Sequence, residues 1–212
     1  MEYQVQYQKY LEKVSSSLKE ACDRFLPEES EVCRAARYSL LGGGKRIRAV
    51  LVLSVCEMLG GDMAAAEQFA VAVEMLHCYS LIHDDLPCMD NDDLRRGRPS
   101  CHKAFSESTA MLAGDVLLTE AFEVIANAPA SAQACVRAAK ALGAGAGSHG
   151  MVYGQELDLK YEALAATEDQ LRLIHRNKTG ALINAAVQMG AAAAEADEET
   201  CNALEAYAYG IG

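Results

Sequence analysis

Helical spacing of apolar residues runs along almost the whole chain and constrains its fold more than any other feature. Residues 2–24 repeat apolar positions at helical intervals, and the runs 46–59 and 63–85 are nearly all apolar. No segment shows the convincing apolar–polar alternation of a half-buried strand. Aromatic residues make up only 6% of the chain, and four prolines accompany abundant alanine, a mixture that favours helix. The sequence therefore predicts an all-α protein.

Glycine and proline residues mark the expected ends of the helices. One helix is expected between Ser30 and Gly42, and Gly60 ends the next. The helix at 63–85 is expected to end before Pro87, because the residue before a proline is biased out of helix. A loop is expected over about 87–104. The remaining helices are expected near 106–127, 130–154, 167–175, 179–193 and 197–212. Since no linker or repeat interrupts the pattern, residues 1–212 are predicted to form a single-domain bundle.

Charge and cysteine content exclude several classes of protein. A net charge of −11 argues against nucleic-acid binding, which needs a basic face, although a local basic cluster can still bind a phosphorylated substrate. The eight cysteines are irregularly spaced without a Cys-x-x-Cys pair, so we expect reduced thiols in a cytoplasmic protein. The first residues lack the features of a signal peptide, and no apolar run approaches the ~20 residues of a membrane span.

The segment from Ser80 to Arg98 places acidic and basic side chains close together. Mg²⁺ binds through one or two carboxylates plus substrate phosphates, and arginine grips phosphate oxygens bidentately. A solvated helix end is the alternative, but here an apolar helix leads into the carboxylates and arginines follow at once. The segment therefore predicts a Mg²⁺–diphosphate site, with a turn at Pro87 that folds Asp90 back toward the first aspartates. Its charged residues are Asp84, Asp85, Asp90, Asp92, Asp93, Arg95, Arg96 and Arg98.

A second basic cluster, Lys45, Arg46 and Arg48, opens the apolar helix 46–59. Three cations at a helix N-terminus oppose the helix macrodipole, and this local cost favours a functional role over a solvated turn. Backbone N–H groups at that terminus would add to an anion pocket. The cluster predicts a second anion-binding group.

Two histidines lie on the helix that leads to the aspartates. His77 is seven residues before Asp84, on the same face and roughly 10 Å away, and is interpreted either as a core residue or as a ligand contact. His83 directly precedes the aspartates and is a candidate metal ligand. Because the two histidines are six positions apart and do not share a face, a zinc pair is not expected.

Two glycine-rich motifs invite comparison with phosphate-binding loops. The run Gly42–Lys45 is not a Walker A loop, because Ser39 and Arg46 stand where glycine and Ser or Thr are required. The run Gly145–Gly150 matches the dinucleotide fingerprint, but it follows a helical stretch instead of a strand. Close packing of helices through small residues is therefore expected there.

Two further polar sets stand at expected helix breaks. Gly154 and Gln155, followed by Asp158, interrupt one helical run, and Lys178-Thr179-Gly180 precede another. Their shared placement at helix breaks predicts that they line one rim.

Taken in order, these motifs resemble the trans-prenyl diphosphate synthases, the family of farnesyl and geranylgeranyl diphosphate synthases. The resemblance covers essentially all 212 residues and implies a bundle of long helices around a central cavity, the isoprenoid synthase-like fold. It also implies Mg²⁺ as cofactor and a homodimer. The segments that carry it are Gly43–Arg48, Glu74–His77, Asp84–Asp90, Asp93–Gly97, Gly154-Gln155 with Asp158, and Lys178–Gly180.

Roles follow from the resemblance position by position. Asp84 and Asp90 would bind Mg²⁺, with Asp85 supporting them. Arg95 and Lys178 would meet the allylic diphosphate. The residues that would hold the diphosphate of isopentenyl diphosphate are Lys45, Arg48, His77 and Arg96. Thr179 and Gln155 would lie near the allylic carbon.

The implied reaction is a head-to-tail condensation of isopentenyl diphosphate with dimethylallyl or geranyl diphosphate. Mg²⁺ and the cations would neutralise the leaving diphosphate so that the allylic C–O bond ionises. The double bond of isopentenyl diphosphate would attack the carbocation, and a proton would then be lost. Oxygens of Thr179 and Gln155 would stabilise the cation in a cavity that excludes water.

The helix before the aspartates also carries residues that predict the length of the product. Tyr79 lies five residues before Asp84, roughly 7.5 Å deeper along the helix axis, where a bulky ring would stop the growing tail and Ser80 would not. In bacterial-type relatives an aromatic residue here, together with a two-residue insertion matching Pro87-Cys88, goes with a C15 product. Farnesyl diphosphate is therefore expected, with geranylgeranyl diphosphate as the alternative.

The chain departs from the family pattern at its end. The second Asp-Asp-x-x-Asp motif of the family is missing, so the C-terminal part, with half of the metal cage, is expected to be absent from these 212 residues. Either the remainder follows Gly212, which the apparently cut helix there favours, or the fragment is inactive.

Other functions fit less of the sequence. A His-Asp type metal phosphohydrolase would use His83 and Asp84 but needs histidines on separate helices. A terpene cyclase would not need Lys45, Arg48 and Arg96 for a second diphosphate. A non-catalytic partner subunit of a prenyl synthase would be expected to lose metal ligands, which are intact in the first motif.

Overall fold

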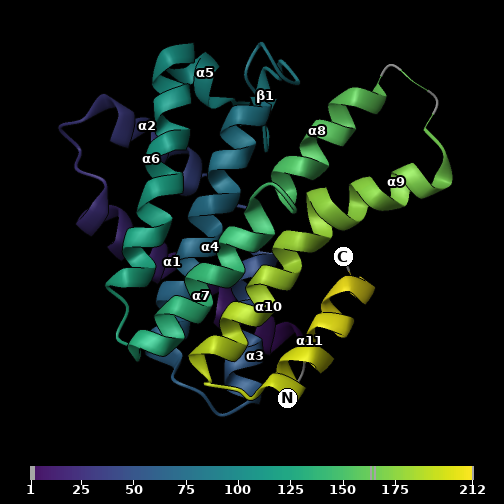
Figure 1. Cartoon of the computed structure of the whole chain (residues 1–212). Coiled ribbons are helices and arrows are strands. Elements are labelled where there is room, and N and C mark those ends of the chain that lie inside the picture. The colour runs from purple at the N-terminus through teal and green to yellow at the C-terminus, as the bar shows by residue number, and fades with distance from the viewer. Residues whose placement is uncertain (1–2, 163, 165, 212) are drawn as a thin grey trace. The chain divides into compact units, whose positions relative to one another are not determined.

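The computed structural model describes residues 3–162, 164 and 166–211, and helices account for most of them (Figure 1). The all-α prediction is confirmed. The chain divides into two compact units, residues 1–50 with 71–127 and residues 51–70 with 128–212. Helices α3 (Ile47–Met58) and α4 (Met63–Asp84) each contribute to both units.

The first unit carries the aspartate–arginine segment. Within it, α2 (Glu31–Leu40) packs against α6 (Glu107–Ala126), and the short α5 (Cys101–Ala104) packs against both. Serine side chains act as N-caps of α2 and α6, since Ser30 accepts from the backbone N–H of Cys33 and Ser106 from that of Thr109. Besides parts of α3 and α4, its elements are α1 (Tyr3–Phe25), α2 (Glu31–Leu40), β1 (Leu94–Arg95), β2 (Arg98–Pro99), α5 (Cys101–Ala104) and α6 (Glu107–Ala126).

The second unit is organised around α10 (Ala181–Ala193), which packs along α7 (Ala132–Ala146) and against α11 (Glu198–Ile211) (Figure 1). Small residues allow this approach: a Cβ on Gly145 would lie 2.7 Å from the Ala185 Cβ and 2.8 Å from the Ala181 carbonyl oxygen. The expected packing through small residues at Gly145 is therefore confirmed. The elements of this unit are α7 (Ala132–Ala146), α8 (Met151–Glu162), α9 (Glu168–Ile174), the π-helix η1 (His175–Gly180), α10 (Ala181–Ala193) and α11 (Glu198–Ile211).

The single helix expected over 130–154 is wrong. Helix α7 ends at Ala146 and α8 begins at Met151, with a turn between them in which the Gly150 N–H donates to the Gly147 carbonyl. A Cβ on Gly150 would lie 2.6 Å from the Gly145 carbonyl carbon. The turn thus depends on a close backbone approach that helical periodicity does not reveal.

The expected break before residue 179 is also wrong. Residues His175–Gly180 form a π-helical segment that continues α9 directly into α10. Such π-helical segments are rare and occur frequently at functional sites. Gly154 is likewise inside α8 and does not interrupt it.

The loop expected over 87–104 contains a small hairpin that the sequence did not reveal. Leu94 pairs with Pro99 and Arg95 with Arg98, so Arg96 and Gly97 form the two-residue turn. Both turn residues have positive φ, 54° and 75°, as in the type I′ turns that suit hairpins. Strands of two residues are too short to produce an alternating pattern.

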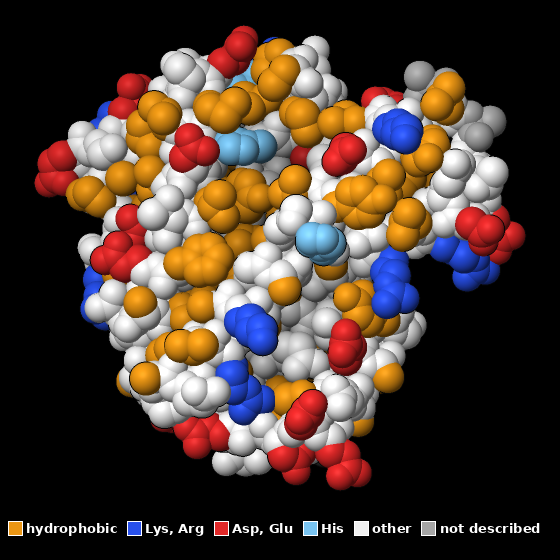
Figure 2. Space-filling model, viewed as in Figure 1, with side chains coloured by type: hydrophobic (Ala, Val, Ile, Leu, Met, Phe, Trp, Pro, Cys, Tyr) orange, Lys and Arg blue, Asp and Glu red, His pale blue; other side chains and the backbone are white. Residues whose placement is uncertain are grey.

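The surface in Figure 2 mixes apolar and charged side chains, with acidic groups at its lower edge near the start of α11. The first turn of α11 carries Glu198 and Glu199, where carboxylates favour the positive end of the helix dipole. Among the described helices, none combines the length and the apolar character needed to cross a bilayer.

Candidate functional site

The end of α4 turns back on itself and brings two predicted metal ligands together. After the turn at Pro87, the Asp90 backbone N–H donates to the Asp84 carbonyl at 2.8 Å, and the Met89 N–H donates to the Leu86 carbonyl at 2.9 Å. The expected return of Asp90 toward Asp84 is confirmed. The two residues therefore lie side by side at the mouth of the turn, with Asp84 half-buried and Asp90 exposed.

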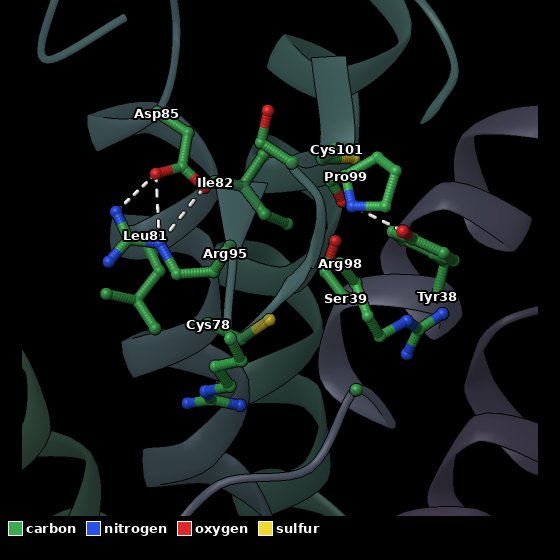
Figure 3. Close-up of a pocket in the computed structure, with 13 residues that line it drawn as sticks. Tyr38, Ser39, Cys78, Leu81, Ile82, Asp85, Arg95, Arg98, Pro99 and Cys101 are labelled. Carbon is green, nitrogen blue, oxygen red and sulfur yellow. Dashed lines mark hydrogen bonds and ion pairs between the residues drawn. The ribbon is translucent and has the colours of Figure 1, made fainter. Parts of the chain in front are cut away.

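Asp85 points elsewhere and is committed to Arg95 (Figure 3). Asp85 is 2% exposed, the Arg95 Nε lies 2.9 Å and 3.2 Å from its two carboxylate oxygens, and the Arg95 Nη2 also contacts it. This hydrogen bonding raises the pKa of Arg95. Asp85 thus holds Arg95 in place. The resemblance had implied that it would support the bound metal instead.

Of the three aspartates predicted to bind or support a metal ion, Asp84 is half-buried and Asp90 is exposed, whereas Asp85 is buried. Within the described part of the chain, no three His, Cys, Asp or Glu side chains form a group that could hold a metal ion, so Asp84, Asp85 and Asp90 are not gathered around one point. Two accessible carboxylates are nevertheless the protein share of a Mg²⁺ site that is completed by substrate phosphates. The donor set fits Mg²⁺ of that kind.

Arg48 and His77 form the centre of the second predicted group. Arg48 Nη1 lies 3.2 Å from His77 Nε2, so the guanidinium donates to the ring nitrogen. Burial and the charge of Arg48 lower the pKa of His77 to about 3, which keeps the imidazole neutral at physiological pH. The Arg48 Nε is buried and has no hydrogen-bond partner among the described residues, which leaves one donor for a ligand oxygen.

Arg96 reaches the same region across the glycine loop. Its Nη1 donates to the Gly43 carbonyl, and a Cβ on Gly44 would lie 2.7 Å from its Cζ. Gly44 also has a φ of 124°, a backbone conformation that residues other than glycine rarely adopt. The positive charges of Arg48 and Arg96 both act on His77. The structure therefore brings together three of the four residues predicted to hold isopentenyl diphosphate, while Lys45 is exposed nearby in the chain.

Arg46 has a structural role that the sequence analysis missed. It forms a buried ion pair with Glu74 at 3.0 Å, with side chains 8% and 2% exposed, and it donates to the Leu40 carbonyl at 2.6 Å. Glu74 also accepts from the Ala49 N–H at 3.3 Å, so its own carboxylate takes an N–H at the start of α3. The signal was a glutamate inside an apolar helix, because a buried charge requires a partner.

Arg95 and Arg98 of the hairpin bind different partners. Both line a small pocket of about 40 Å³ (Figure 3). Arg95 and Asp85 line one side. On the other, Arg98 lies 4.2 Å above the Tyr38 ring, and the Tyr38 hydroxyl donates to the Pro99 carbonyl at 2.8 Å. The pocket has room for a few waters only. Arg98 therefore fastens the hairpin to α2.

The polar sets on α8 and η1 meet within the second unit. Lys178 Nζ pairs with Asp158 at 2.5 Å, and Gln155 is half-buried with an Nε2 atom that has no partner in the described part of the chain. Thr179 is exposed. The two sets are brought together as expected, although neither lies at a helix break.

Gly154→Ala is expected to destabilise the protein by about 3 kcal/mol, since overpacking against rigid neighbours costs this much. An added Cβ would lie 2.6 Å from the Lys178 Cα, and backbone cannot move as a flexible side chain can. Thermal unfolding monitored by circular dichroism measures the change. Gly210→Ala is the control, because no atom of the described residues lies within 4 Å of a Cβ there. Equal melting temperatures for the two variants would contradict the prediction.

Tyr79 and Ser80, the predicted chain-length residues, occupy the buried face and the flank of α4. Tyr79 is 9% exposed, its pKa is raised by burial, and its ring meets the His83 ring edge-on at 5.6 Å. The Ser80 hydroxyl donates to the His77 carbonyl at 2.9 Å within the helix. His83 Nε2 donates to the Met111 carbonyl at 2.9 Å, so this nitrogen is already used.

Comparison with known proteins assigns the family. A profile of the polyprenyl synthetase family matches residues 29–212. Geranylgeranyl pyrophosphate synthase 4 of Arabidopsis thaliana is 42% identical over 211 residues, covering 97% of this chain and 57% of the relative. Farnesyl diphosphate synthase of Micrococcus luteus is 47% identical over 178 residues, covering 84% and 60%. The chain thus spans less than two thirds of these curated relatives.

Solved structures agree. A geranyltransferase from Legionella pneumophila matches with a TM-score of 0.90 at 42% identity, covering 97% of this chain and 73% of that one. An FPP/GFPP synthase from Zymomonas mobilis matches with a TM-score of 0.91 at 36% identity, covering 98% and 77%. The predicted isoprenoid synthase-like fold class is confirmed by these matches. On the evidence of sequence, fold and motif order together, the chain belongs to the polyprenyl synthetase family.

Proposed function

We propose that this protein is a prenyltransferase that condenses isopentenyl diphosphate head-to-tail with dimethylallyl or geranyl diphosphate, with farnesyl diphosphate as its product. The observation that carries the proposal is the half-buried Arg48–His77 pair, in which the buried Arg48 Nε has no acceptor among the described residues and both Arg48 and Arg96 act on His77. Relatives named as farnesyl and geranylgeranyl diphosphate synthases support it.

The Arg48–His77 pair is suited to a diphosphate. Burial lowers the pKa of Arg48, so its charge is disfavoured there until an anion compensates it. His77 stays neutral and accepts from Arg48, which directs the remaining guanidinium N–H groups elsewhere. Arg96 adds a second cation whose pKa is also lowered by burial. We assign the diphosphate of isopentenyl diphosphate to this group, with Lys45 at its exposed edge.

The carboxylate turn and Arg95 are assigned to the allylic substrate. Mg²⁺, when bound, supplies charge neutralisation for the leaving diphosphate. Asp84 and Asp90 are the side chains that would hold it together with phosphate oxygens, and Asp85 keeps Arg95 in a fixed orientation. A preoriented cation stabilises developing negative charge without reorganisation during the reaction.

The second unit is assigned the groups nearest the reacting carbon. Lys178 would bind the allylic diphosphate, and the oxygens of Thr179 and Gln155 would stabilise the carbocation. The pair between Lys178 and Asp158 orients the lysine, and Gln155 carries an amide nitrogen without a described partner. The unpartnered Gln155 Nε2 is a donor and would face an oxygen of the diphosphate, while the amide oxygen would face the carbocation.

The direct test is an assay of the protein at its full natural length with isopentenyl and dimethylallyl diphosphates and Mg²⁺. A C15 diphosphate and released diphosphate are expected, and a chelator is expected to abolish both. A folded protein that forms no condensation product would overturn the proposal. Metal-dependent release of phosphate without chain growth would instead support the phosphohydrolase alternative.

Tyr79→Ala is expected to lengthen the product beyond C15, because the buried ring is proposed to block the growing tail. Removing a large side chain leaves a cavity that an apolar tail can enter. Reversed-phase chromatography of the dephosphorylated products measures the distribution. Ser80→Ala is the control, since its hydroxyl is bonded to its own helix and the side chain is small. An unchanged C15 product from Tyr79→Ala would contradict the proposal that Tyr79 is the floor of the cavity, the side chain that stops the growing tail.

Assembly and location are proposals of a coarser kind. We propose a cytoplasmic homodimer, testable by light scattering during size-exclusion chromatography and by fractionation of cells. One relative, 42% identical over 215 residues, is the Arabidopsis thaliana heterodimeric geranylgeranyl pyrophosphate synthase large subunit 1. A monomer active by itself would contradict the dimer.

A further inference from the structure

We propose that His83 is a positioning residue for product length, which acts by holding the Tyr79 ring, and that Gly114 is glycine to make room for it. The inference rests on the proposed prenyltransferase function. It concerns a contact between α4 and α6 inside the first unit.

The His83 ring is held on more than one side. Its Nε2 donates to the carbonyl of Met111 on α6 at 2.9 Å. A Cβ on Gly114 would lie 2.5 Å from His83 Cδ2 and 2.8 Å from Cε1, so the ring covers the Cα of that glycine. The missing side chain at Gly114 is therefore the space that the imidazole occupies, and the hydrogen bond fixes its orientation in that space.

The third neighbour of the imidazole is Tyr79, one helical turn earlier on α4. The two ring centroids are 5.6 Å apart with an interplanar angle of 81°, an edge-to-face arrangement. Side chains four residues apart on a helix face each other, so this contact follows from their spacing. Because the imidazole is itself fixed to α6, the tyrosine ring rests against a rigid wall.

This arrangement ties the proposed floor to the proposed metal ligands. His83 is adjacent to Asp84, and its bond to Met111 fastens the last turn of α4 to α6. The distance between the Tyr79 ring and Asp84 is then fixed by the last helical turn of α4, which His83 holds rigid. If the imidazole is removed or displaced, Tyr79 gains side-chain freedom while the carboxylates remain.

The test compares the products of His83→Ala and Gly114→Ala in the full-length protein. Both variants are expected to raise the ratio of C20 to C15 product by roughly two- to tenfold, the range that one edge-to-face ring pair contributes. Gly210→Ala is the matched glycine control, since its Cβ would meet no atom within 4 Å in the part of the chain that the structure describes, and it is expected to keep the wild-type ratio. A ratio of products does not depend on how much of each variant folds.

A double variant separates positioning from a general loss of structure. In the Tyr79→Ala background, His83→Ala is expected to cause no further lengthening, because the ring that it holds is gone. Additive lengthening would overturn the proposal, as would a wild-type product ratio from both single variants. Absence of any condensation by the wild-type protein would instead overturn the proposed function itself.

Discussion

Asp84→Asn is expected to lower kcat for condensation by roughly 10²–10³-fold, the usual loss when one preorganised electrostatic group is removed. Asparagine keeps the size of the side chain and removes the negative charge, so a weaker Mg²⁺ site is the expected cause. Asp84 lies beside Asp90 because the turn at Pro87 joins their backbones, and these two carboxylates are the ones proposed to hold Mg²⁺. Steady-state kinetics at several Mg²⁺ concentrations measure both the rate and its metal dependence.

Two controls give this experiment its meaning. Asp115→Asn changes an exposed carboxylate on α6 and is expected to leave kcat at the wild-type level. The melting temperature of Asp84→Asn is expected to stay close to that of the wild type, because Asp84 is only half-buried. A wild-type rate for Asp84→Asn at limiting Mg²⁺ would contradict the assignment of Asp84 as a metal ligand.

Glu74→Gln is expected to destabilise the protein by about 3–5 kcal/mol, because it leaves the buried charge of Arg46 without its partner. Glu74 also accepts from the Ala49 N–H, so the start of α3 is weakened too. For a chain of this size, the loss corresponds to a melting temperature lower by roughly 6–20 °C. Denaturant unfolding measures the free energy directly.

Matched variants identify the unpaired charge as the cause. The double variant Arg46→Met/Glu74→Leu is expected to recover much of the lost stability, since it replaces the pair by apolar groups. Glu168→Gln breaks the exposed pair with Arg172 and is expected to cost no more than about 0.5 kcal/mol. If Glu74→Gln cost as little as this surface control, the buried pair would have no special role.

The helix ends that could be predicted are those marked by local chemistry. Ser30 and Ser106 begin helices because their side chains satisfy free backbone N–H groups, and Pro87 follows the end of α4 because proline disfavours helix before it. The turn at Gly150 and the π-helix at His175–Gly180 left no such mark. They depend on close backbone contacts between segments of the second unit that are distant in sequence. One example is the approach of the Lys178 backbone to Gly154.

The chemistry of the site was legible in the sequence, but the partners of its charged groups were not. Residue type and spacing predicted a Mg²⁺–diphosphate site at Asp84 and Asp90, because these are local properties, and the resemblance to prenyl diphosphate synthases implied the roles of Arg48 and His77. Only the tertiary structure decided that Arg46 pairs with Glu74 and that Arg98 lies on Tyr38. The physical reason is that the energy of a charge depends on its burial and on groups within a few ångströms. In this protein those groups come from segments distant in the sequence, which only folding brings together.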